Sequence, residues 1–140
     1  MKAINSFHDS GSVDVSIISD FESDIGYNFP NYYKMLLSKH NELYPEEDTF
    51  NFFNKLTGKV DNRDVSFLGF GPNITSSSNI ERFQEHDIYG REGIVVIGCA
   101  ANGDYICFDY RDEPATNNPS VVIMFHDCCD DDGKMLVCIV

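Results

Sequence analysis

This chain has 140 residues, a length typical of one domain and sufficient for one hydrophobic core. Hydrophobic residues make up 42% of it and aromatic residues 13%, which excludes a disordered acidic tail. Because 23 Asp and Glu stand against 10 Lys and Arg, the formal net charge is −13, which disfavours nucleic-acid and anionic-membrane binding and favours a basic protein partner.

The N-terminal segment and the cysteine content indicate where the protein works. Residues 1–12 contain no apolar run of signal-peptide length, and no later stretch approaches the ~20 apolar residues needed to span a bilayer. Five cysteines cannot all pair within one chain, which fits a reduced compartment. We therefore expect a cytoplasmic protein without a membrane span.

Two helices are predicted in the first third of the chain. Residues 13–26 carry an apolar stripe at helical spacing, and Gly26 is placed to end that helix. Pro30 suits the first turn of a second helix, where its missing N–H costs nothing. The stripes that we expect to face the core are Ile17, Ile18, Phe21 and Ile25 in the first helix, and Tyr33, Leu36, Leu37 and His40 in the second.

Short elements follow in the middle of the chain. Residues 50–53 and 65–70 are typical of short strands, and the Gly-Pro pair at 71–72 ends the second one. Ser78 and Glu81 have the spacing of a capping box, which predicts a short helix after Ser78.

The clearest local signal is a hairpin in residues 94–110. Residues 94–101 and 104–110 flank an Asn-Gly pair at 102–103, a favoured dipeptide for a two-residue turn. A turn that tight pairs Cys99 with Ile106.

Residues 121–125 and 135–140 predict a second strand pair, joined by an acidic loop at 127–133. Helices come early and strands cluster late, and no linker divides the chain. We therefore predict an α+β fold, with a mainly antiparallel twisted sheet and helices packed beside it, in a single domain over residues 1–140.

The acidic loop contains residue types that can carry chemistry. Cys128 and Cys129 lie next to His126, but a thiol nucleophile needs a lowered pKa and the neighbouring carboxylates disfavour the thiolate. A structural zinc site needs a second ligand cluster. In a calcium loop with Gly133 at its sixth position, Cys128 and Ile139 would occupy the two anchor positions, which require carboxylates. We predict a hairpin tip exposed to solvent, with no catalytic residue, metal or cofactor.

Three stretches resemble the SUKH superfamily of Smi/Knr-like domains. Residues 17–37 (IISDFESDIGYNFPNYYKMLL) are similar to the family's opening helix, its glycine, its apolar-proline step and its second helix. Residues 97–109 (IGCAANGDYICFD) are similar to its central hairpin, and residues 121–127 (VVIMFHD) to the strand that follows. The resemblance runs from about residue 16 to the end of the chain.

The chain departs from the family pattern in three places. Asn41-Glu42 replaces a common Asn-Gly, and Phe125 stands where Trp is frequent. Members commonly continue beyond the equivalent of Val140 into a closing helix, so we expect that helix to be missing. The resemblance implies a twisted sheet beside helices, no cofactor, and a bacterial immunity protein that neutralises a cognate toxin domain, often a nuclease of a contact-dependent system, by occlusion.

The leading hypothesis combines this resemblance with the charge: the chain binds a basic toxin domain. Carboxylates of the acidic loop would contact that partner, those after the hairpin would form a second patch, and two tyrosines would anchor it. The residues are Asp127, Asp130, Asp131 and Asp132 in the loop, Asp109, Asp112 and Glu113 in the second patch, and Tyr110 and Tyr89 as anchors.

Two other hypotheses remain open. A regulatory or scaffold domain with a housekeeping partner would matter in cells without the toxin, whereas an immunity protein would then be dispensable, so gene deletion separates the two.

A thiol-dependent enzyme is the third hypothesis, and it requires one of the adjacent cysteines. We expect Cys128→Ser and Cys129→Ser variants to keep full biological activity, because the surrounding carboxylates disfavour the thiolate. A loss of activity in either variant would support the enzyme.

Overall fold

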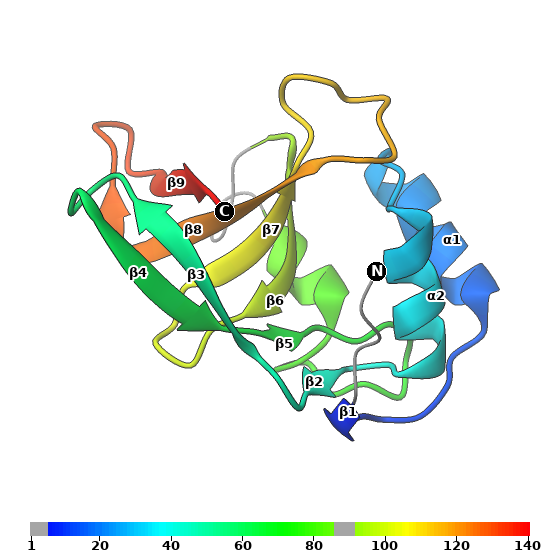
Figure 1. Cartoon of the computed structure of the whole chain (residues 1–140). Coiled ribbons are helices and arrows are strands. Elements are labelled where there is room, and N and C mark those ends of the chain that lie inside the picture. The colour runs from blue at the N-terminus through cyan, green and yellow to red at the C-terminus, as the bar shows by residue number, and fades with distance from the viewer. Residues whose placement is uncertain (1–5, 86–91) are drawn as a thin grey trace.

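A five-stranded antiparallel sheet forms the centre of the computed structural model, which describes residues 6–85 and 92–140 (Figure 1). In spatial order its strands are β5 (Ser66–Phe67), β6 (Ile94–Cys99), β7 (Tyr105–Asp109), β8 (Ser120–Cys129) and β9 (Met135–Ile139). The helices are α1 (Val15–Ile25), α2 (Asn31–Lys39) and the 3-10 helix η1 (Ile80–Gln84). Two strand pairs complete the fold: β1 (Ser6–His8) with β2 (Tyr44–Pro45), and β3 (Thr49–Asn54) with β4 (Lys59–Asp64). The predicted α+β class is confirmed.

The two predicted helices are present, with one shifted boundary. α1 ends at Gly26, whose φ of 78° is left-handed and favours glycine. Pro30 has an extended ψ of 140° and is the cap that precedes α2, not a residue of its first turn. A carboxylate of α1 holds this connection, because Glu22 accepts the Phe29 N–H at 2.7 Å and pairs with Lys34 of α2 at 2.7 Å.

Aromatic side chains join the helices to one face of the sheet. Phe29 meets Tyr33 with ring centroids 5.0 Å apart, and Tyr33 meets Phe108 of β7 at 5.1 Å. On the opposite face of β7, Tyr105 lies 6.1 Å from Phe83 of η1. Helices therefore contact both faces of β7. β8 is buried without alternation over residues 122–125, where Phe125 packs against Phe52 of β3.

The short helix η1 begins one residue later than the capping-box spacing predicts. Asn79, not Ser78, is the cap, and its side chain accepts the Glu81 N–H at 3.1 Å. At the other end of η1, the Gln84 amide donates to Val96 O at 2.8 Å and accepts from Val96 N at 3.2 Å. The Gln84 side chain thus hydrogen-bonds the backbone N–H and C=O of Val96, which the two-residue β5 does not reach.

The central hairpin is present, but its register differs from the predicted one. Cys99 pairs with Tyr105, not with Ile106. The connection has three residues, 101–103, and Gly103 adopts a φ of 98°. A three-residue connection that ends in a left-handed glycine adds a bulge and moves the pairing by one residue.

The structure differs from the predicted strands in other places too. β4 was not predicted, because its sequence KVDNRD contains a single apolar residue and no alternation. The strand expected over 65–70 is limited to Ser66–Phe67. Conversely, β8 continues to Cys129, so the acidic loop shrinks to a turn at residues 130–134.

Tyr110 connects the end of β7 to the α1–α2 connection. Its side chain is fully buried, its ring stacks on Tyr27 at 4.6 Å, and its hydroxyl donates to Asn28 O at 2.6 Å. The hydroxyl therefore closes the far end of the sheet against the helices.

Replacing Tyr110 with Phe should lower the free energy of unfolding by about 1 kcal/mol, because Asn28 O then loses its donor. Urea denaturation measures this. The matched control is Tyr32→Phe, since Tyr32 is half-exposed and its hydroxyl makes no hydrogen bond within the described residues. Equal losses in the two variants would contradict the assigned role.

Candidate functional site

The predicted acidic residues form two groups at opposite ends of β8 (Figure 1). Asp109, Asp112 and Glu113 lie at the end of β7 and in the connection that follows it. The remaining four lie at the end of β8 and in its turn to β9. Asp109 pairs with Ser120 at the start of β8, and Asp127 lies near the other end of that strand, so about 20 Å of strand separates the nearest members and the structure does not bring the groups together.

The turn between β8 and β9 is built around one of its aspartates. Asp130 accepts the backbone N–H of Asp132 at 2.9 Å and that of Lys134 at 3.0 Å through one carboxylate oxygen. Its role is therefore structural. Asp127, Asp131 and Asp132 are exposed, and we call these three residues the acidic tip.

The second group is partly neutralised. The Asp109 carboxylate accepts hydrogen bonds from Nε and Nη2 of Arg111, at 3.0 and 2.9 Å. Burial acts to raise the pKa of Asp109, but the bonds from Arg111 outweigh it and the pKa is lowered. Asp112 and Glu113 are exposed.

Neither of the two predicted aromatic anchors is found on the surface of the described residues. Tyr110 has 0% exposure, so its side chain lies in the core instead of facing a partner. Alternation along the predicted strand 104–110 puts Tyr110 on the same face as Phe108, which is also buried and whose ring lies 6.5 Å away, so this pattern was the signal that could have indicated its burial. Tyr89 lies outside the described residues.

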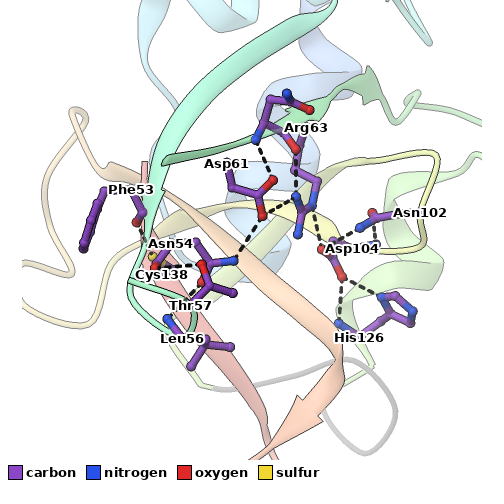
Figure 2. A network of polar contacts seen from close by, with 11 residues as sticks. Phe53, Asn54, Leu56, Thr57, Asp61, Arg63, Asn102, Asp104, His126 and Cys138 are labelled. Atoms are coloured by element: carbon purple, nitrogen blue, oxygen red, sulfur yellow. Dashed lines mark hydrogen bonds and ion pairs between the residues drawn. The ribbon is translucent and has the colours of Figure 1, made fainter. Parts of the chain in front are cut away.

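A buried carboxylate that sequence reasoning missed organises the polar interior (Figure 2). Asp104 is 1% exposed and accepts from Arg63 Nε at 2.9 Å and Asn102 Nδ2 at 3.0 Å. Its other oxygen contacts the His126 backbone N at 3.1 Å and the ring Nδ1 at 2.5 Å. A charged residue directly after a hairpin turn, followed by a buried strand, is the signal that could have indicated it.

Arg63 connects this carboxylate to the β3–β4 hairpin. Its guanidinium pairs with Asp61 at 3.0 Å and lies over the rings of Phe52 and Phe125, 5.4 and 6.0 Å from their centroids. One cation therefore joins β4, β3 and β8.

The surroundings of Asp104 favour its ionised form over the protonated one. Burial acts to raise its pKa, but hydrogen bonds from His126, Arg63 and Asn102 together lower the pKa below the usual 3.8. All three donors come from different segments of the chain.

The same residues fit a metal ion poorly. One ligand atom each from Asp104, His126 and Asp127 lie within 4.8 Å of one another, a set that includes both oxygen and nitrogen donors. However, Asp104 already accepts four hydrogen bonds, one of them from a guanidinium that would repel a cation. The arrangement is a closed ion-pair network, not an open coordination site.

The thiol of Cys128 shows no activation. Partial burial, together with the Asp127 carboxylate, raises the pKa of the Cys128 thiol, which confirms the direction predicted from the sequence. The thiolate, the nucleophilic form, is thus disfavoured.

Comparison with known proteins gives one match. The model of the SMI1 / KNR4 family (SUKH-1) matches residues 13–138, which include the acidic tip and the Asp104 network. No curated protein and no solved structure matches the chain. In the described part of the chain, no helix has the length and apolar character needed to cross a membrane.

Replacing Asp104 with Asn should lower the free energy of unfolding by about 3 kcal/mol, because the buried end of Arg63 loses its counter-ion. Chemical denaturation at pH 7 measures the loss. Asp112→Asn removes an exposed carboxylate and should change stability by less than about 0.5 kcal/mol. Similar losses in both variants would contradict the role of the network.

The lowered pKa also predicts a pH dependence. Because the folded pKa of Asp104 lies below 3.8, its stabilising contribution is present above that pH and is lost as the pH falls through the folded value. Between pH 5 and pH 2, unfolding free energies measured for Asp104→Asn should therefore fall less steeply than those of the unchanged chain. Parallel curves would exclude the linkage.

Proposed function

The chain belongs to the SMI1 / KNR4 family (SUKH-1), and from this membership and its charge we propose that it is a bacterial immunity protein that neutralises a cognate toxin domain by occlusion. The family is known for proteins of the immunity type. The match over residues 13–138 is the observation that carries the proposal.

The charge supports a basic toxin. A net charge of −13 raises the encounter rate with a positively charged partner and opposes binding to phosphate backbones. Nuclease domains hold nucleic acid and therefore present basic surfaces. We propose a nuclease toxin as the partner and the cytoplasm of the producing cell as the place of binding.

The acidic tip is the proposed steering surface. Asp127, Asp131 and Asp132 are exposed, and none of the three forms an ion pair with a Lys or Arg within the described residues. Asp112 and Glu113, at the opposite end of β8, are a separate second patch. An interface that buries about 800 Å² on each partner also needs apolar anchors, which neither patch provides.

Co-expression tests the function directly. The toxin domain encoded beside this gene should arrest growth when expressed alone, and co-expression of this chain should restore growth. Purified toxin domain and chain should form a stable complex. Arrest that persists despite expression of the folded chain would overturn the proposal.

Charge reversal tests the steering surface. Asp131→Lys together with Asp132→Lys should slow association with the toxin domain about tenfold at low ionic strength, measured by stopped flow. Glu46→Lys with Asp48→Lys is the control, because it changes the net charge equally on another exposed segment. If both double variants slow association alike, only net charge matters and the tip is not the site.

A further inference from the structure

A groove of about 270 Å³ lies between α1 and the segment that leads into η1. Its floor is apolar and its rim is acidic. The apolar lining residues are Ile17, Phe21, Phe70, Pro72 and Ile80, of which Phe21, Phe70 and Ile80 are buried and form the floor. The rim carboxylates are the exposed Asp20, Asp24 and Glu81. The volume lies below the ~300–1,000 Å³ of small-molecule pockets, so it suits one or two side chains of a protein partner.

Two side-chain amides hold the floor in shape, that of Asn41, which is buried, and that of Asn79, which is partly buried. The Asn41 side chain donates to Phe70 O at 2.9 Å and accepts from Phe70 N at 2.8 Å. The Asn79 side chain donates to Gly71 O at 2.9 Å. Because the backbone of residues 70 and 71 is fixed on both sides, the groove exists before any partner arrives, which reduces the ordering cost of binding.

The rim charges act against the stability of the free chain. Asp20 and Asp24 are four residues apart on α1, where like charges repel across one turn. Asp24 also lies in the last turn, at the negative end of the helix dipole, and that turn contains no basic residue. Within the described residues, neither these two nor Glu81 forms an ion pair, so nothing there offsets the repulsion.

We propose that this groove binds an aliphatic side chain of a basic segment of the partner, whose flanking Lys or Arg residues face Asp20, Asp24 and Glu81. Charge complementarity selects the occupant, since the rim contributes three carboxylates and the described residues of the lining include no cation. The inference rests on the proposed function for a basic partner and adds the apolar anchor that the acidic tip lacks.

Titration with a defined peptide tests the groove without the toxin. The probe is acetyl-Lys-Lys-Leu-Lys-Lys-amide, followed by amide chemical shifts of the ¹⁵N-labelled chain at low ionic strength. Saturable shifts should concentrate on α1 and η1. The same peptide with Ser in place of Leu should bind about fivefold more weakly, since the apolar contact is lost, and one with Glu in place of Lys should cause no saturable shifts. Shifts of equal size at Asp131 and Asp132, or equal affinity for the Ser peptide, would overturn the proposal.

A single substitution separates binding from structure. Asp24→Lys should lower the affinity for the peptide that contains Leu about fivefold. It should also raise the Tm of the free chain by about 2 °C, because the repulsion in α1 is relieved. Glu46→Lys makes the same charge change on a distant segment and should leave peptide affinity within about twofold. A lower Tm with unchanged peptide binding would assign Asp24 a structural role and overturn the proposal.

The two proposals can fail separately. If the toxin domain binds and Asp24→Lys leaves its affinity unchanged, the groove is wrong and the immunity function stands. If the peptide occupies the groove but no toxin is neutralised, the function is wrong and the groove stands as a binding site.

Discussion

The β3–β4 hairpin is held against the central sheet by the hydrogen bonds and ion pair of one buried carboxylate, that of Asp104. This carboxylate accepts from Asn102 in the central turn, from Arg63 on β4 and from His126 on β8. Removing a carboxylate from water is costly, and here several donors, one of them a guanidinium, offset that cost. The consequence is that β4, which has almost no apolar residues, is held against the sheet by charge instead of by a hydrophobic face.

This network divides the acidic residues of the chain into two kinds. Carboxylates such as Glu22, Asp104 and Asp109 each bind a cation or several N–H groups and stabilise the fold. The acidic tip and the groove rim contain carboxylates without a cation in the described part of the chain. Because the second kind contributes repulsion and no internal pairing, it is the kind expected to act on a partner. Charge at the tip speeds encounter, whereas an apolar anchor in a groove slows dissociation.

Much of the fold could be predicted because local periodicity reflects burial. Both long helices, the glycine that ends α1 and the late cluster of strands follow from the spacing of apolar residues. The prediction is wrong where a turn glycine or a capping side chain, and not the spacing of apolar residues, sets the register of a hairpin or the start of a helix. Gly103 lengthens the central connection by one residue, and Asn79, not Ser78, caps η1.

The candidate site was less predictable than the fold. By itself the sequence determined the acidic surplus, the helices and strands that apolar spacing encodes, and a family pattern that the match confirms. Only the tertiary structure decided that Tyr110 stacks on Tyr27 and that Arg63 reaches Asp104 across 41 positions. It also decided that three rim carboxylates surround an apolar floor. Local spacing reports which face of an element is buried, but the partner of a buried charge and the walls of a groove come from segments that meet only on folding.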